Sequence, residues 1–286
     1  MLEAILDLGM GDALHARSFL ITYCMQKQIN HKDVIIYPGR HKDFFENDNF
    51  ILKENPRPDV KFFRYDNFGQ LNILKKYDDC SDSVKTICIN SGIKFDFNIV
   101  TPLNWKLPDI SELDIPETFI TVNYGYDDAI NPDKVCSKVW PLDYWIELVK
   151  KINIPCIQIG SGRNCKTIQG VSKNFVNKLS IKQSAAIMKK AKFHIDIEGG
   201  LAILNYHLGC KSVVLFGPTS IKRFGLNKNL NLWNTECKTS PCNPKNINSI
   251  YHGIYRDKNN VECSLRCMKD LTPTYVIDKI YENKWL

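Results

Sequence analysis

Short apolar segments alternate with amphipathic ones along almost the whole chain, and this alternation constrains the fold more than any other feature. Apolar runs predict buried strands, and segments with apolar residues three or four positions apart predict helices. Strands separated by helices favour parallel sheets joined by right-handed crossovers, which is the pattern of an α/β protein. The predicted strands are residues 2–8, 34–37, 60–65, 86–89, 119–123, 156–159, 193–197 and 213–216.

The predicted helices have recognisable starts. Ser180 and Gln183 have the spacing of a capping box, which satisfies two free amides at a helix start. Thr272 followed by Pro273 is typical of a helix whose first residue is proline. The predicted helices are residues 14–25, 141–152, 201–208 and 273–283, and a further helix is predicted to begin at Ser180.

The chain of 286 residues is long enough for one large domain or two small ones. Residues 104–117 carry two prolines and little periodicity, so this stretch is the best linker candidate. We therefore expect an N-terminal Rossmann-like domain at 1–104, a linker at 105–117 and a C-terminal Rossmann-like domain at 118–286. The last helix could pack back on the N-terminal domain. Ligands of such sheets bind at the carboxyl ends of the strands.

Composition narrows the class of protein. Lys and Arg number 38 against 31 Asp and Glu, and this excess of +7 suits an anionic small molecule or a membrane surface better than nucleic acid. No apolar run is long enough to span a bilayer, and the N-terminus lacks the basic start of a signal peptide. Eleven cysteines, an odd number, favour a reducing compartment. We expect a cytoplasmic protein, with peripheral contact to the inner membrane as an option.

The N-terminal strand runs into a turn with Gly9 and Gly11 and then into a helix. Leu14 stands where a dinucleotide-binding fingerprint needs its third glycine, so NAD binding is disfavoured. Asp12 lies at the helix start. It either satisfies the first amides of the helix or acts as a catalytic base, and the local pattern leaves both readings open.

Lys138 precedes Trp140 and Pro141 just before an amphipathic helix. A cation next to free helix amides suits a diphosphate. The alternative is a solvated lysine beside a core tryptophan.

Glycine-containing loops follow four of the predicted strands and could each contact an anionic ligand, although each pattern alone also fits an ordinary turn. After strand 193–197, the glycine amides could hold a phosphate or ribose, and Glu198 could accept hydrogen bonds from ribose hydroxyls. A metal bound by Asp196 and Glu198 is disfavoured. The candidate donor-binding residues are Asn123, Gly125, Gly160, Ser161, Glu198, Gly199, Gly200, Leu201, Gly217, Pro218 and Thr219.

Four segments together resemble glycosyltransferase family 9, the bacterial ADP-heptose heptosyltransferases and their relatives. They are GMGDALHA at 9–16, KVWPLDYWIELVKKI at 138–152, KLSIKQSAAIMKKAKFHIDIEGGLAI at 178–203 and SVVLFGPTS at 212–220. The resemblance implies a GT-B fold, with two Rossmann-like domains facing across a cleft. It also implies that the N-terminal domain takes the acceptor and the C-terminal domain takes the nucleotide-sugar.

The resemblance implies inverting transfer of heptose or a related sugar, with ADP-heptose as the first donor to consider. Asp12 would be the base and Lys138 would stabilise the leaving diphosphate, a role that suits a fixed cation because charge grows there. Gly11, His15 and Arg40 would lie on the acceptor side. The acceptor would be a glycan, a lipid-linked glycan such as lipopolysaccharide, or a protein, and no metal would be required for catalysis.

The chain departs from the family pattern at one motif. Many heptosyltransferases carry Asp-Thr-Gly-Leu-x-His where this chain has Glu198-Gly-Gly-Leu-Ala-Ile203. The histidine is absent, and fewer side chains remain to bind phosphates. Two other functions stay open: a non-catalytic nucleotide-sugar-binding relative, and a sugar-nucleotide epimerase of GT-B shape.

Four cysteines lie close together late in the chain: Cys237, Cys242, Cys263 and Cys267. Four thiolates in two pairs suit tetrahedral zinc or iron, and some relatives carry a metal-binding cysteine cluster here. Free thiols and two disulfides are the alternatives. We expect a structural metal that would staple the surrounding loop.

Overall fold

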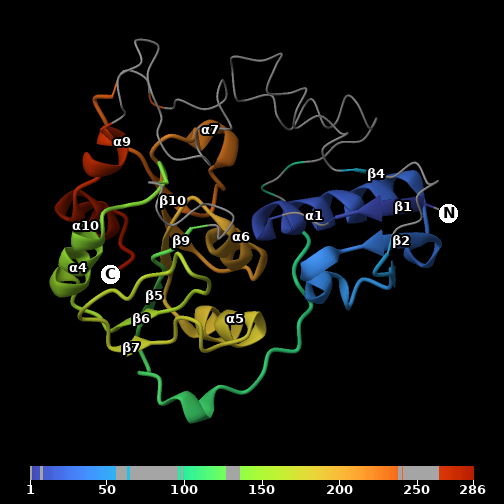
Figure 1. Ribbon diagram of the computed structural model, residues 1–286, viewed down its shortest axis with the longest axis horizontal. Helices are drawn as coiled ribbons and strands as arrows, with labels where there is room; N and C mark the ends of the chain where they lie inside the picture. Colours follow the sequence, from blue (N-terminus) through green and yellow to red (C-terminus); the bar gives the residue numbers. More distant parts are fainter. Residues whose placement is uncertain are drawn as a thin grey trace. The chain divides into compact units, whose positions relative to one another are not determined.

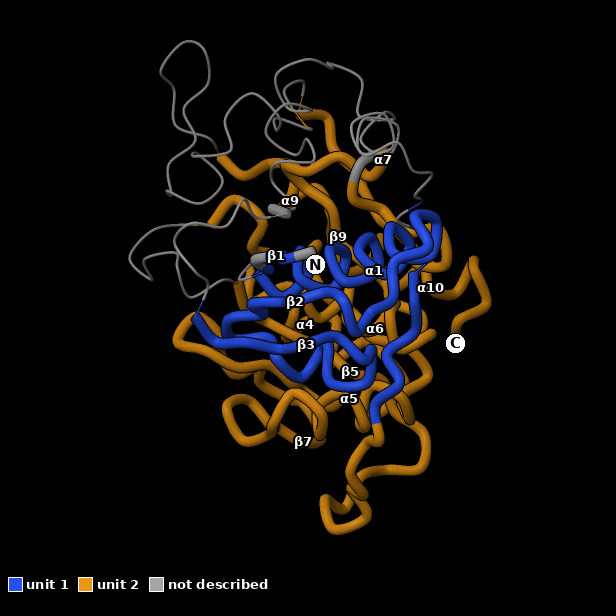
Figure 2. The backbone as a smooth tube through the Cα atoms, turned by 90° about the vertical axis from the view of Figure 1, so that its right-hand side faces the viewer, with its two compact units in different colours: residues 1–105 blue, residues 106–286 orange. Residues whose placement is uncertain are grey.

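The computed structural model describes residues 2–6, 9–55, 63–64, 96, 98, 100–126, 136–237, 240 and 264–286 (Figure 1). The chain divides into two compact units, Met1–Trp105 and Lys106–Leu286 (Figure 2). Each unit contains a parallel sheet, as the alternation of strands and helices predicts. None of the helices in these ranges combines the length and apolarity needed to cross a bilayer.

Unit 1 holds a four-stranded parallel sheet in the order β3-β2-β1-β4. The long helix α1 (Met10–Lys27) begins four residues before the predicted start, so Asp12 lies in its first turn. The predicted strand 86–89 lies outside the described residues. The strands are β1 (Leu2–Ile5), β2 (Val34–Tyr37), β3 (Ile51–Leu52) and β4 (Phe63–Arg64), with 3-10 turns η1 (His31–Asp33) and η2 (Gly39–Phe45).

Unit 2 holds a six-stranded parallel sheet in the order β10-β9-β8-β5-β6-β7. Its central strands are those predicted from the apolar runs. The strands are β5 (Ile120–Val122), β6 (Cys156–Gln158), β7 (Lys173–Asn174), β8 (His194–Ile197), β9 (Ser212–Leu215) and β10 (Leu230–Leu232). The helices are α4 (Leu142–Lys151), α5 (Ile181–Lys190), α6 (Gly200–His207), α7 (Ile221–Phe224), α9 (Arg266–Lys269) and α10 (Pro273–Glu282).

Two helix starts follow the predicted capping patterns. The Ser180 hydroxyl accepts from the amide of Gln183, and the Gln183 side chain accepts from the amide of Ser180. Thr272 caps α10, with Pro273 as its first residue. α10 packs against α4 of the same unit, where the sequence had also allowed a return to the N-terminal domain.

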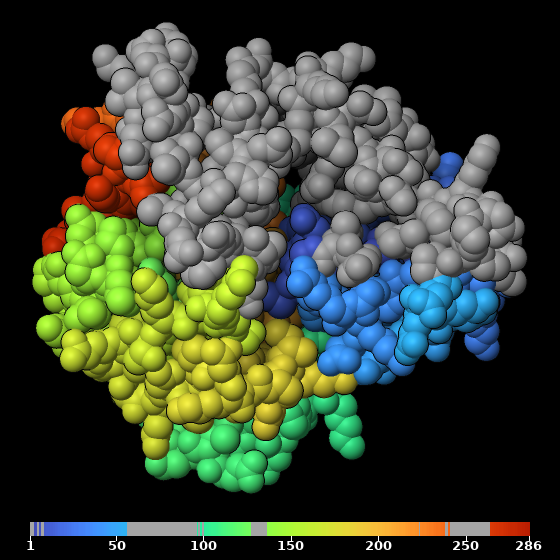
Figure 3. Space-filling view, viewed as in Figure 1, coloured from blue at the N-terminus to red at the C-terminus, as the bar shows by residue number. Residues whose placement is uncertain are grey.

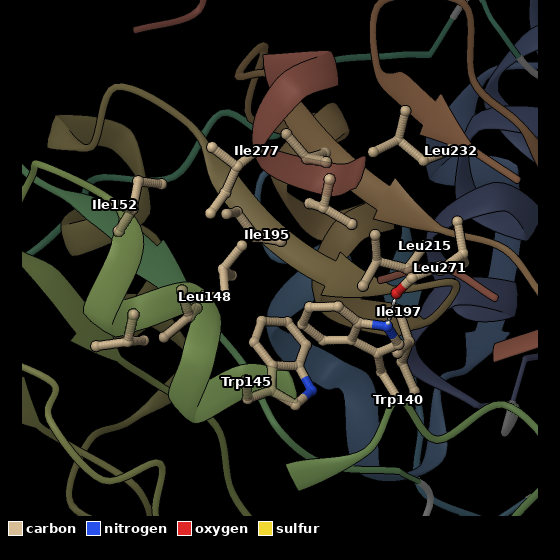
Figure 4. Packing of buried hydrophobic residues seen from close by; sticks show 14 of the residues in the cluster. Trp140, Trp145, Leu148, Ile152, Ile195, Ile197, Leu215, Leu232, Leu271 and Ile277 are labelled. Carbon is tan, nitrogen blue, oxygen red and sulfur yellow. Dashed lines mark hydrogen bonds between the residues drawn. The ribbon is translucent and has the colours of Figure 1, made fainter. Parts of the chain in front are cut away.

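The apolar core of unit 2 lies between one face of the sheet and the helices α4 and α10 (Figure 4). Side chains alternate along β9, so that Val213 and Leu215 join this core while Val214 packs with Ala202 of α6 on the opposite face. The sheet is thus covered on both faces, as expected for a parallel sheet. Its carboxyl edge is left to the loops.

The segment 106–117, most of the predicted linker, is counted with unit 2 and carries the 3-10 turn η5 (Ser111–Leu113). Its residues are mostly exposed or half-buried, and its green atoms lie at the surface in Figure 3. Lys173 at β7 forms an ion pair of 2.7 Å with Asp114 of this segment. The segment is therefore tied to the outer edge of the second sheet.

Candidate functional site

The predicted donor-binding residues follow strands β5, β6, β8 and β9 of unit 2 directly. The four strands lie side by side in the order β9-β8-β5-β6, and each neighbouring pair is parallel. Their carboxyl ends therefore meet at one edge of the sheet, where open α/β sheets bind ligands. The topology brings the predicted loops to this one edge, although the sequence separates them by up to about a hundred residues.

Lys138 and Glu198 form an ion pair at this edge through Nζ and Oε2. Their side chains are only 19% and 11% exposed, so the pair is largely shielded from solvent. Glu198 follows β8, and Lys138 lies in the turn before α4. The structure thus brings the lysine before α4 and the carboxylate after β8 together in one charged centre.

Trp140 fixes the segment that carries Lys138. Its ring is fully buried, and its Nε1–H donates to the carbonyl oxygen of Leu271 over 2.7 Å (Figure 4). The ring also packs edge-on against Trp145, with 5.0 Å between centroids. The tryptophan of the sequence motif is therefore a core anchor that holds the lysine two residues away.

The helix α6 begins beside Glu198, with Gly199 at its N-cap position. Gly199 has no side chain that could accept a hydrogen bond from the first amides of α6, so this helix start has no side-chain cap at its N-cap residue. The amides of the first turn, which include Gly200 and Leu201, have no partner inside the helix and carry its positive dipole end. An anion bound here would meet these amides and the Lys138 cation together.

The Asn123 side chain, a predicted donor-binding group, is held by two neighbouring side chains. Its Nδ2 donates to Asp196 Oδ1 over 3.0 Å, and its Oδ1 accepts a hydrogen bond of 3.6 Å from the Cys165 thiol. A Cβ on Gly160, which has φ of +133°, would lie 2.5 Å from that Oδ1. Gly160 therefore allows close packing against Asn123. Asn123 is 8% exposed, and its amide group is held between Asp196 and Cys165.

Asp196 is a buried carboxylate near the site that the sequence analysis did not name as a candidate. It is 1% exposed and faces Asn123, while Glu198 pairs with Lys138, so the two carboxylates serve different partners. The sequence signal was the polar residues that alternate with apolar ones in HIDI at 194–197.

The loop after β9 is closely packed. The carbonyl oxygen of Gly217 accepts from the Ser240 hydroxyl over 2.6 Å, and a Cβ on Gly217 would overlap the side chain of Met268. Thr219 is 1% exposed, and its hydroxyl has no hydrogen-bond partner within the described ranges. Glycine at 217 is thus explained by packing against α9.

The neutral groups around the charged centre are held in their protonated forms. Burial raises the pKa of the Cys136 thiol, which lies two residues before Lys138. Burial likewise raises the pKa of Tyr124, which follows Asn123, to about 12. The site therefore holds its charge on Lys138 and Glu198 and not on these flanking groups.

In unit 1, Asp12 is exposed in the first turn of α1, and Gly11 beside it is buried. A Cβ on Gly9 would lie 3.8 Å from Asp12 Oδ2, so the carboxylate turns back toward the helix start. His15, one turn along α1, is half-buried, and Arg40, in η2 shortly after β2, is exposed. Because β1 and β2 are parallel neighbours, Asp12 and Arg40 follow adjacent carboxyl ends of the unit 1 sheet.

Cys237 and Cys267 lie on two segments that are hydrogen-bonded side by side. The Asp270 carboxylate accepts from the Thr235 hydroxyl over 2.8 Å and from the amide of Glu236 over 3.1 Å. Cys242 and Cys263 lie outside the described residues. Within the described ranges, no group of three or more potential metal ligands is present.

No protein-family model and no curated protein matches the sequence. Solved structures with a similar fold include the iron-containing dodecameric glycosyltransferase TibC from enterotoxigenic E. coli H10407, with a TM-score of 0.71 and 14% identity over 98% of this chain and 75% of that one. A glycosyltransferase family 9 protein from Veillonella parvula DSM 2008 has a TM-score of 0.64 and 12% identity, covering 98% of this chain and 95% of that one.

E. coli ADP-heptose LPS heptosyltransferase II has a TM-score of 0.52 and 14% identity, covering 98% of this chain and 97% of that one. The structural neighbours are thus heptosyltransferases and family 9 glycosyltransferases, the group that the sequence motifs resemble. At these identities the likeness establishes the fold. It confirms the predicted α/β class with two parallel sheets.

Proposed function

We propose that the chain is an inverting glycosyltransferase that takes its sugar from a nucleoside-diphosphate donor. The observation that carries the proposal is the shielded Lys138–Glu198 pair beside the uncapped start of α6. A fixed cation and free helix amides form the environment that a diphosphate requires. A second TibC structure, a complex with ADP-D-β-D-heptose, is similar to this chain with a TM-score of 0.68. ADP-heptose is therefore the first donor to test.

In this proposal, Glu198 keeps Lys138 in place until the donor arrives. The diphosphate then takes over the lysine, and the freed Glu198 carboxylate accepts hydrogen bonds from sugar or ribose hydroxyls. The lysine cation thus keeps an anionic partner throughout, and the carboxylate keeps hydrogen-bond donors, because an unpaired charge in a shielded site would be costly.

The transfer step needs one base and one stabilised leaving group. The acceptor oxygen forms a bond to the anomeric carbon as the bond from that carbon to the diphosphate oxygen breaks. The proton of the acceptor hydroxyl goes to the Asp12 carboxylate. Lys138 and the α6 amides stabilise the charge that grows on the diphosphate. Attack opposite the leaving group inverts the anomeric configuration.

The acceptor side of the proposal rests on Gly11, His15 and Arg40. We propose a glycan, lipid-linked glycan or protein acceptor that is modified in the cytoplasm or at the inner-membrane surface. The resemblance to heptosyltransferases and the net charge of +7 support this part.

A panel of ADP-, UDP- and GDP-sugars tests the proposal on the full chain. A donor at about 100 times its Kd should stabilise the fold by about 2.7 kcal/mol, which a thermal-shift assay detects. Asp12→Asn should keep this stabilisation and lose nucleotide release, and Lys138→Met should lose both. Lys150→Met, at an exposed lysine of α4, is the matched control.

Three outcomes contradict parts of the proposal. Absence of stabilisation by every donor argues against a glycosyltransferase. Full activity of Asp12→Asn overturns the base assignment. Binding by the wild-type chain without turnover across an acceptor panel indicates a non-catalytic relative, and a changed sugar without any acceptor indicates an epimerase.

We also propose that Cys237, Cys242, Cys263 and Cys267 hold one structural zinc or iron ion. The support is that the first and last of them lie on segments joined through Asp270. Such an ion would fasten the intervening loop. Metal analysis of the purified protein should find about one equivalent, and a content below about half an equivalent overturns the assignment.

A further inference from the structure

Two pairs of buried polar side chains join β5 and the residue that follows it to β8. Thr121 is paired in register with His194, and two residues further along, directly after β5, Asn123 binds Asp196. All four side chains are buried, with exposures of 0%, 0%, 8% and 1% for Thr121, His194, Asn123 and Asp196. We call these four residues the polar ladder.

Hydrogen bonds connect the ladder along its whole length. The Thr121 hydroxyl lies 3.0 Å from His194 Nδ1, and His194 Nε2 lies 3.4 Å from Asp196 Oδ2. Asp196 Oδ1 accepts from Asn123 Nδ2 over 3.0 Å and from the amide of Ile197 over 2.8 Å. A neutral imidazole satisfies this chain when Thr121 donates to Nδ1 and Nε2–H donates to the carboxylate.

The ladder is an unusual feature for the interior of a parallel sheet. The strand residues that alternate with it are all apolar and pack under α4 and α10: Ile120, Val122, Ile195 and Ile197. A buried carboxylate costs several kcal/mol unless its partners are in place. Apolar residues of similar volume would pack in these positions without this desolvation cost. We therefore look for a role of the polar ladder besides packing.

The position of Asp196 indicates that role. Backbone pairing between β5 and β8 ends with the amide of Asn123, which donates to the carbonyl oxygen of Ile195. Beyond this point, one oxygen of Asp196 joins the two strands, because it binds the Asn123 side chain and the amide of Ile197 together. The next residue after Ile197 is Glu198, which holds Lys138.

We propose that Asp196 is a positioning residue for the donor site, which it serves by fixing the ends of β5 and β8 relative to each other. It acts through Glu198 and Lys138 and does not touch the donor. Its partner is Asn123, the residue directly after β5. This inference rests on the proposed function for its catalytic meaning, while its structural part, the joining of two loops, is independent of it.

Kinetics of four variants test the catalytic part. Asp196→Leu leaves the Ile197 amide and the Asn123 side chain without an acceptor, so we expect the donor KM to rise about 10-fold or more while the acceptor KM stays unchanged. Asp196→Asn keeps an acceptor oxygen and should stay within about threefold of the wild type. Asn123→Ala should raise the donor KM as Asp196→Leu does, and it remains informative if Asp196→Leu fails to fold. Thr121→Val, at the far end of the ladder, is the control and should leave the donor KM unchanged.

A fall in kcat with both KM values unchanged, or equal effects of Asp196→Asn and Asp196→Leu, overturns the positioning role. Amide hydrogen exchange separates this result from failure of the proposed function. Residues 123–126 and 197–201 should exchange faster in Asn123→Ala than in Thr121→Val, whether or not any donor binds. Unchanged exchange overturns the structural part. Faster exchange in a protein that binds no nucleotide supports the structural part and overturns the catalytic one.

Discussion

Arg17 of α1 is 1% exposed and donates two hydrogen bonds of 2.6 Å to the Asp48 carboxylate. Its guanidinium also donates to the carbonyl oxygens of Thr101 and Pro102. Removal of one partner from such a buried pair leaves an uncompensated charge. We expect Arg17→Met to lower the free energy of unfolding by about 3–5 kcal/mol, measured by urea denaturation.

Lys173→Met is the control for this prediction. Lys173 pairs with Asp114 over a similar distance of 2.7 Å, but the Asp114 side chain is 92% exposed. Exposed ion pairs contribute about 0–1 kcal/mol. Equal losses in the two variants would show that burial does not set the value of the Arg17 pair.

Gly160 and Gly209 allow two causes of glycine preference to be separated. Both have a positive φ, +133° for Gly160 and +76° for Gly209. A Cβ added at Gly160 would lie 2.5 Å from Asn123 Oδ1, whereas a Cβ added at Gly209 would meet open space. We expect Gly209→Ala to cost about 1–2 kcal/mol from backbone strain. Gly160→Ala should cost about 1–3 kcal/mol more through overpacking. Thermal denaturation measures both, and equal losses would contradict the close packing of Asn123.

Single residues also show where sequence reasoning stops. Lys138 and Glu198 were each identified from local patterns, a cation or a carboxylate beside a helix start. Their pairing across 60 positions was not visible, and neither was the link from Asp196 to Asn123 across 73. Such partners become apparent only when two strands are placed in register.

At the scale of elements, predictability follows the length of the local signal. The capping box at α5 and the apolar face of α4 were readable because several residues repeat one period. The edge strands β7 and β10 were missed because their sequences, Lys173–Asn174 and Leu230–Leu232, do not form an uninterrupted apolar run. Their conformation depends on pairing with β6 and β9, which local sequence does not contain.

A substitution of Trp140, in the turn before α4, tests whether this buried ring supports the Lys138–Glu198 pair. Trp140→Phe removes the hydrogen bond to the Leu271 carbonyl while it keeps an aromatic ring in the core. The unsatisfied buried carbonyl should cost about 1–3 kcal/mol of stability. Because Trp140 holds the segment of Lys138, calorimetry should also show weaker ADP binding. Unchanged affinity in a destabilised protein would separate the anchor from the site.

At the scale of the whole molecule, alternation of strands and helices was enough to predict two parallel sheets. The positions of the strand ends were enough to bring the predicted donor-binding loops to one edge. The fold is shared with TibC at 14% identity, so the pattern of apolar positions carries it with few fixed residues. Asp12 and Arg40 reach neighbouring strand ends by the same rule. Their assignment to the acceptor comes from resemblance, because exposed polar residues at a sheet edge suit many ligands.

The free energy of unfolding of the whole chain should fall as the pH rises above about 9. Burial raises the pKa of the Cys156 thiol to about 12 and that of the Cys24 thiol to about 11, from the ordinary thiol value of 9.0. Above pH 9 the unfolded chain releases these protons while the folded chain keeps them, so stability present below pH 9 is lost as the pH rises toward the folded values.

Each thiol should contribute a slope of up to about 1.4 kcal/mol per pH unit in this window. Urea denaturation at pH 8 and pH 10.5 under reducing conditions measures the combined loss. Cys156→Ala should lower stability at pH 8 through lost packing, yet it should show a shallower fall toward pH 10.5. The double variant with Cys24→Ala should flatten the fall further, since each buried thiol adds its own proton release. A fall as steep as that of the wild type in both variants would place the alkaline sensitivity in other groups.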